Sequence, residues 1–174
     1  CPGGTIFITK GMINLTKNED ELASVIAHEV AHISQRDGIA SIKQSRWTEA
    51  LTIVGTEAAK QYGPQELSRL VSIFEGSIDD VFKTLVVNGY GQSQEFAADE
   101  IALTYLSRAG YSPAALKGFL DRLANSAKTS GGILKTHPGT AERLEKVKQK
   151  VKEAGVDASA MQYRNQRYAQ YLRK

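Results

Sequence analysis

Residues Asn18–Arg36 read NEDELASVIAHEVAHISQR, and this stretch decides the fold that we expect. Asn18 can begin a helix, because its side chain can accept a hydrogen bond from a backbone N–H of the first turn. Acidic residues at 19–21 favour the positive end of the helix dipole, and Glu21 lies three residues after the cap, as in a capping box. Asp37-Gly38 ends the pattern. The stretch therefore predicts a helix that runs from Asn18 to about Arg36.

The segment His28-Glu29-Val30-Ala31-His32 lies in the middle of this helix. His28 and His32 are four residues apart, so both imidazoles lie on one face, where they can bind one Zn²⁺ at about 2.0–2.1 Å. Glu29 lies next to the metal without ligating it, and it can take a proton from the attacking water. The alternative is a pair of surface histidines at this spacing, but a chance match is on the order of one in a few hundred. The segment thus predicts one zinc ion per chain.

Two histidines leave a catalytic zinc one protein ligand short, since it normally takes three and keeps one position for water. Glu95 is the best carboxylate, because Asp99 lies four residues further along the same helix face. There Asp99 can accept a hydrogen bond from the outer nitrogen of a ligating histidine. Glu100 lies off that face and is a weaker candidate for the third ligand. His137, the third histidine of the chain, is a further candidate.

The rest of the sequence predicts an α+β fold that is predominantly helical. Helical spacing and capping signals predict further helices over about 39–61, 65–88, 94–109, 113–125, 139–155 and 158–172. Residues 5–9, Thr-Ile-Phe-Ile-Thr, predict one strand, whose sheet partners we expect upstream of Cys1. This strand could hold an extended substrate as an added strand, and the polar loop over 126–136 could act as a lid.

Composition narrows the classes of function. The 174 residues are 41% hydrophobic and 24% charged, with a net charge of +3, as expected for one soluble domain with no nucleic-acid partner. The longest apolar runs are far below the roughly 20 residues of a membrane span. A lone cysteine, Cys1, could carry a lipid, but we interpret it as a residue inside a larger domain that is cut at this point. Oligomeric state cannot be predicted from these features.

The segments His28–His32 and Glu95–Asp99 resemble the zinc peptidase family of the CAAX prenyl protease and the heat-shock protease HtpX. The chain is most similar to the soluble, exported BepA-type branch of that family. Further similar segments lie at 2–11, 109–113 and 136–143, so the resemblance extends from residue 2 to about residue 147. The chain departs from the family at Gly91-Gln92, where relatives often have Ser-Arg, and at Ala97-Ala98.

The resemblance implies a gluzincin-like peptidase domain with a small sheet next to the active-site helix. Its zinc ligands would be His28, His32 and Glu95, with Glu29 as the base. His137 would lie near the metal, where it could assist catalysis by stabilising the oxyanion. The matching histidine of the BepA type can instead reach the zinc and block the water position. Tyr90 is a weaker candidate for the oxyanion.

The implied activity is that of a zinc metalloendopeptidase acting on protein or peptide substrates, in the bacterial periplasm or cell envelope, as part of protein quality control. Because the family domain begins well before Cys1, we interpret 1–174 as a single metallopeptidase domain that lacks its N-terminal part. Three alternatives are a zinc hydrolase of non-peptide amides, a non-catalytic chaperone or assembly module that contains zinc, and a protease that inhibits itself through His137.

Overall fold

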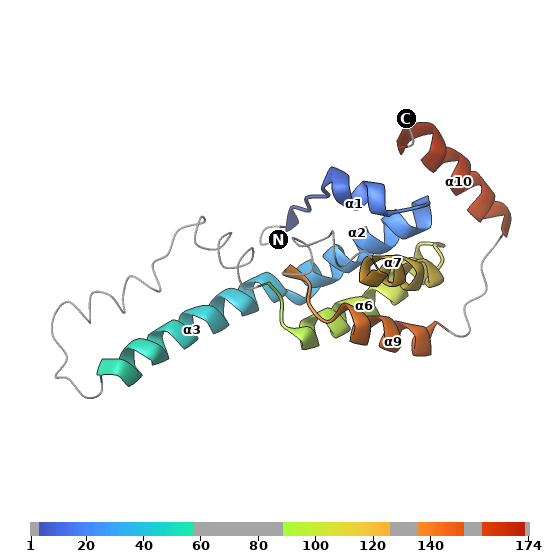
Figure 1. Cartoon of the computed structure of the whole chain (residues 1–174). Coiled ribbons are helices and arrows are strands. Elements are labelled where there is room, and N and C mark those ends of the chain that lie inside the picture. The colour runs from blue at the N-terminus through green and yellow to red at the C-terminus, as the bar shows by residue number, and fades with distance from the viewer. Residues whose placement is uncertain (1–3, 58–88, 126–135, 152–157, 173–174) are drawn as a thin grey trace.

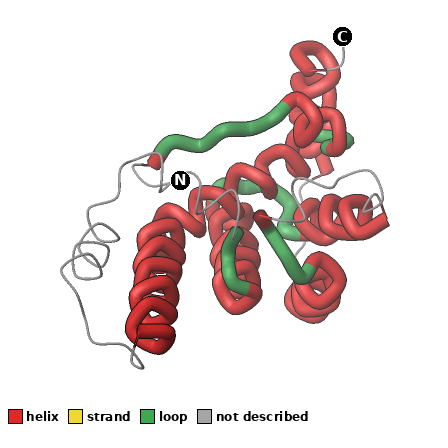
Figure 2. Tube along the Cα trace, turned by 60° about the vertical axis from the view of Figure 1, so that its left-hand side comes forward, coloured by secondary structure: helices red, strands yellow, loops and turns green. Residues whose placement is uncertain are grey.

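The computed structural model describes residues 4–57, 89–125, 136–151 and 158–172 (Figure 1). Within these ranges the secondary structure is helical, and Figure 2 shows no strand in them. The helices are α1 (Lys10–Leu15), α2 (Glu19–Gln35), α3 (Asp37–Glu57), α6 (Gln92–Arg108), α7 (Ala114–Asn125), α9 (Thr140–Lys150) and α10 (Ala158–Leu172). The predominantly helical fold is confirmed, whereas the helix predicted over 65–88 and most of the loop predicted over 126–136 lie outside the described residues.

The strand predicted over residues 5–9 does not appear as a strand. A strand is defined by hydrogen bonds to a neighbouring strand, and these residues pair with no other described part of the chain. Ile8 instead packs against the buried side chains of Val25, Phe119 and Leu123, while Phe7 is 74% exposed. The small sheet next to the active-site helix therefore stays a prediction, as does the single domain over 1–174.

Helix α2 begins and ends where the sequence predicts. The side chain of Asn18 accepts a hydrogen bond of 2.9 Å from the backbone N–H of Glu21, while Glu21 Oε2 accepts one of 2.7 Å from the N–H of Lys17. The helix ends at Gln35, and the next residue, Arg36, caps it with a φ of 59°, in the left-handed region. This residue interrupts the helix between α2 and α3 and places Asp37 against the last turn of α2, where its carboxylate contacts His32.

The core lies between α2, α6, α7 and α9. Helix α2 packs against α6 and α7, and α9 covers α6 and α7 from another side (Figure 1). The buried residues of the main cluster are Ala27, Ala102, Leu106, Leu116, Leu120, Leu144 and Val147. Ala31 of α2 and Ala98 of α6 are also fully buried, and such small side chains let two helix backbones approach closely. The α2–α6 contact is what positions the residues of the candidate site.

Of the described helices, three lie outside this core, and the first of them, α1, packs against α7. Helix α3 extends away from the other helices (Figure 1), whereas α10 packs against the first turn of α2. Arg164 of α10 forms an ion pair with Asp20, at 2.6 Å from Nε to Oδ1, and the hydroxyls of Tyr168 and Thr16 are 2.6 Å apart. Among the described residues, no helix is long and apolar enough to cross a membrane.

Candidate metal centre

Helices α2 and α6 bring the three predicted ligands together. The Nε2 atoms of His28 and His32 are 3.0 Å apart. Glu95 of α6 faces both rings, with Oε1 at 3.2 Å from His32 Nε2 and Oε2 at 3.3 Å from His28 Nε2. All three residues are buried, and Glu95 has no exposed surface. Two imidazole nitrogens and a carboxylate oxygen thus converge on one point.

His137 joins the same cluster from the segment that precedes α9. Its Nδ1 is 3.0 Å from Glu95 Oε1 and 3.4 Å from His28 Nε2. One donor atom from each of four residues, His28, His32, Glu95 and His137, lies within 4.8 Å of the other three, so these residues could hold a metal ion. The backbone fixes this segment, because Thr136 O accepts a hydrogen bond of 3.0 Å from the N–H of Tyr90.

Each histidine of α2 has a carboxylate at its outer nitrogen. Asp99 Oδ1 lies 2.9 Å from His28 Nδ1, in the place that the sequence predicts, and Asp37 Oδ2 lies 2.8 Å from His32 Nδ1. Such partners hold the proton on Nδ1 and direct the Nε2 lone pair inward, as in metal sites generally. Sequence reasoning missed Asp37, which it interpreted only as the end of the helix. The one available signal was its position five residues after His32.

Behind Asp37, a further side chain fixes the carboxylate. Gln94, the residue before Glu95, donates from Nε2 to Asp37 Oδ1 at 3.2 Å. The oxygen of the same amide accepts hydrogen bonds from the backbone N–H of Gly91 and the hydroxyl of Ser41. The start of α6 is therefore connected to α3 and to the outer side of His32.

Arg143 of α9 contacts two carboxylates of the cluster, those of Asp99 and Glu95. Its Nε and Nη2 each donate to Asp99 at 2.8 Å, and its Nη1 lies 2.6 Å from Glu95 Oε2. Burial raises the pKa of Asp99, but hydrogen bonds from Arg143 and His28 outweigh burial and hold that pKa below its usual range. The charged run that begins at Arg143 is typical of a solvated helix face, and for Arg143 that prediction is wrong, because the residue is buried.

Burial and hydrogen bonding shift the pKa values of the cluster residues in opposite directions. Burial raises the pKa of Glu95, but its contacts with His137, His28 and His32 outweigh burial, so the carboxylate is ionised. Burial lowers the pKa of His28, but hydrogen bonds to Asp99 and Glu95 raise it to about 8. In the metal-free protein His28 therefore holds a proton near neutral pH, which a metal ion must displace in order to bind.

Glu29 and Tyr90 lie at the edge of the cluster. Glu29 is partly exposed, and its Oε1 lies 3.6 Å from His137 Nε2. The ring of Tyr90 stacks on His32, with centroids 3.9 Å apart and an angle of 11° between the planes. Burial raises the pKa of Tyr90 to about 12, so its phenol stays neutral. The structure thus places both residues beside the converging donor atoms.

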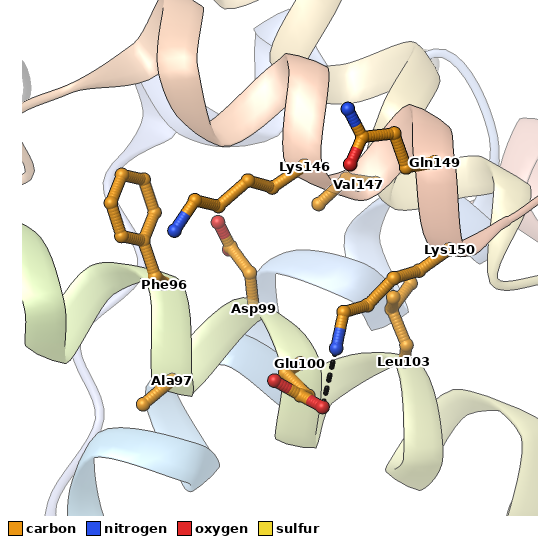
Figure 3. Close-up of a pocket in the computed structure, with 9 residues that line it drawn as sticks. All are labelled: Phe96, Ala97, Asp99, Glu100, Leu103, Lys146, Val147, Gln149 and Lys150. Carbon is orange, nitrogen blue, oxygen red and sulfur yellow. Dashed lines mark ion pairs between the residues drawn. The ribbon is translucent and has the colours of Figure 1, made fainter.

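Glu100 does not join the cluster. Its side chain faces a pocket of about 390 Å³ between α6 and α9, where it forms an ion pair of 2.5 Å with Lys150 (Figure 3). In the same pocket Lys146 Nζ lies 3.6 Å from the centre of the Phe96 ring. Asp99 lines this pocket, but none of the cluster histidines does. The pocket and the metal cluster are therefore separate features.

The chain belongs to Peptidase family M48, whose model matches residues 1–151. It is 32% identical over 152 residues to the beta-barrel assembly-enhancing protease of Yersinia pestis, covering 82% of this chain and 29% of that protein. It is 28% identical over 158 residues to the mitochondrial metalloendopeptidase OMA1 of Schizosaccharomyces pombe, covering 89% of this chain and 43% of that protein.

A protease HtpX homolog of Salinibacter ruber is 29% identical over 164 residues, covering 83% of this chain and 59% of that protein. The family resemblance inferred from the motifs is thereby confirmed. The chain spans about a third of the length of the beta-barrel assembly-enhancing proteases that it matches.

Proposed function

We propose that the chain is the catalytic part of a zinc-dependent metalloendopeptidase that hydrolyses peptide bonds of protein substrates. One observation carries this proposal: donor atoms of His28, His32 and Glu95 converge in a buried centre. Two histidines and one glutamate are a ligand set of catalytic zinc sites. Membership of a peptidase family supports the same reaction class.

The residues present fit a zinc ion. Zinc prefers nitrogen and oxygen donors of this kind, and His28 and His32 each have an outer carboxylate that directs Nε2 toward the centre. Glu95 is ionised, as a ligand must be. When bound, zinc would supply a Lewis acid that polarises the scissile carbonyl and lowers the pKa of water.

Glu29 is the residue that we propose as general base. It follows the first histidine on α2, and its carboxylate is partly open to solvent while the neighbouring ligands are buried. From this position Glu29 can accept a proton from the attacking water and pass it to the leaving amine. The neutral phenol of Tyr90 and the Nε2 of His137 are the nearby groups that could donate to the oxyanion.

His137 supports a second state of the same site. Because its Nδ1 lies within reach of the same centre as the three proposed ligands, His137 could act as a fourth donor. A zinc ion with four protein ligands has no position for water and is held inactive. We therefore propose that the enzyme can be self-inhibited through His137. In the described part of the chain, no contact favours a non-catalytic chaperone over a peptidase.

We also propose that the protein acts in the bacterial periplasm or cell envelope, in protein quality control. This proposal is supported by the similarity to proteases named for beta-barrel assembly. Because the chain covers 29% of those proteins, their activity and partners are carried over here only as a hypothesis.

A digest of casein and of a peptide library tests the function. The zinc-loaded chain should cleave both, and a chelator should abolish cleavage. Glu29→Gln should lower the rate by roughly 10²–10⁴-fold, the usual contribution of a general base. Glu145→Gln is the matched control, because Glu145 is exposed and its ion pair in the described part of the chain is with Lys148, away from the histidines. Equal cleavage by Glu29→Gln, or hydrolysis of non-peptide amides alone, would contradict the proposal.

A further inference from the structure

Arg143 is a buried cation whose role the family motif does not explain. It is the fourth residue of α9, and its backbone N–H donates to Gly139 O at 2.9 Å. The side chain is directed from α9 toward α6 and is only 4% exposed. A guanidinium so buried needs carboxylate partners, because an unpaired buried charge is strongly unfavourable.

Both partners of Arg143 belong to the metal centre. Two of its nitrogens bind Asp99 as a fork, at 2.8 Å each, and the third nitrogen lies 2.6 Å from Glu95 Oε2. Nε and Nη2 thus donate hydrogen bonds to Asp99, whereas Nη1 makes an ion-pair contact with Glu95 Oε2. The rigid, planar geometry of this group fixes the two carboxylates relative to each other, which the single ammonium of a lysine cannot do.

The contact with Arg143 distinguishes the two oxygens of Glu95. Oε2 lies between Arg143 Nη1 and His28, whereas Oε1 faces His32 Nε2 at 3.2 Å and His137 Nδ1 at 3.0 Å. Oε1 can thus bind a metal ion that lies among the histidines, while Oε2 stays in contact with Arg143. Binding through both oxygens would require Oε2 to leave the guanidinium.

We propose that Arg143 is a positioning residue that makes Glu95 a one-oxygen zinc ligand and holds Asp99 against His28. The inference rests on the proposed zinc site and deepens it. By withholding the second oxygen of Glu95, Arg143 keeps the coordination number low and leaves a position for water. By fixing Asp99, it also sets the orientation of the His28 ring.

Zinc K-edge X-ray absorption of the zinc-loaded full chain, combined with a zinc affinity titration, tests this role. The wild type should show one oxygen from Glu95 at about 2.0–2.2 Å. Arg143→Gln and Arg143→Lys should both raise the number of oxygen neighbours and weaken zinc binding by about 10–100-fold, as loss of outer partners does. Arg143→Lys should not restore zinc binding, because an ammonium keeps the positive charge but cannot make the two parallel hydrogen bonds to Asp99.

Arg164→Lys is the matched control, because Arg164 is also a buried arginine that binds a carboxylate, Asp20, on α2 away from the histidines. It should change neither the absorption spectrum nor the zinc affinity. A wild type in which Glu95 binds through both oxygens overturns the inference without any variant. Unchanged affinity and spectrum in both Arg143 variants overturn it as well. A wild type that binds no zinc contradicts the proposed function itself, so the two failures are distinguishable.

Discussion

The hydrogen bond between Asp37 and His32 gives a prediction whose size follows from the structure. The two atoms are 2.8 Å apart, and both residues are buried. Asp37→Asn keeps the shape of the side chain but replaces a charge-assisted hydrogen bond, worth about 1.5–3 kcal/mol, with a neutral one worth about 0.5–1.5 kcal/mol. The difference between the midpoints of these ranges, about 1.2 kcal/mol, corresponds to roughly eightfold weaker zinc binding.

Competition of the protein with a chromophoric chelator measures this change in the dissociation constant for zinc. Asp121→Asn is the control, because Asp121 is exposed on α7 and lies outside the metal cluster. Far-UV circular dichroism of the metal-free variants establishes that both fold. If Asp37→Asn bound zinc within twofold of the wild type, or if Asp121→Asn lost as much affinity, the role given to Asp37 would be refuted.

Three further predictions concern other parts of the structure. His137→Ala should change the rate of peptide cleavage, with a rise if His137 blocks the site as a fourth donor and a fall if it donates to the oxyanion; if neither cleavage nor zinc affinity changed, His137 would be an ordinary loop residue. Asp20→Ala should lower the free energy of unfolding by about 3 kcal/mol in urea denaturation, because it leaves Arg164 buried and unpaired, and a loss below about 1 kcal/mol would contradict this. The raised pKa of His28, about 8 against an ordinary 6.5, stabilises the metal-free protein fully below pH 6.5, and this contribution of about 2 kcal/mol should be lost as the pH rises through 8. Denaturation curves that do not change over this pH range would show that His28 is not paired in this way.

The features that the sequence predicted correctly are local ones. Helix α2 was predictable because a cap, an acidic first turn and a stop signal lie within one stretch of chain. The position of Glu95 and Asp99 on one face of a helix was predictable, because residues four apart lie on the same side of a helix. That His28 and Asp99 then meet across α2 and α6 agrees with the expectation that a ligating histidine needs an outer carboxylate.

The features that the sequence did not predict depend on tertiary packing. Asp37 reaches His32 only because Arg36 adopts a left-handed conformation, which nothing in that residue type predicts. Arg143 reaches Asp99 only because α9 packs on α6, and its sequence neighbours are charged residues typical of a solvated helix face. Long-range contacts of this kind are not encoded by the periodicity of a single segment.

Residues 5–9 illustrate another limit of the sequence pattern. The alternation of Ile6 and Ile8 with more exposed residues is typical of a half-buried strand. The same alternation is satisfied here by an extended segment whose Ile8 side chain packs against a helical core. A hydrophobic pattern indicates which side chains are buried, but a sheet also needs a second strand at hydrogen-bonding distance.

We propose that His28, His32 and Glu95 hold one zinc ion, with Glu29 beside it as the base. Elemental analysis of the purified chain, its Glu95→Ala variant and its Glu29→Gln variant tests that claim most directly. The wild type and Glu29→Gln should each contain one zinc per chain after dialysis, and Glu95→Ala should contain much less. A wild type without zinc, or a Glu95→Ala variant that retains a full equivalent, would contradict the account.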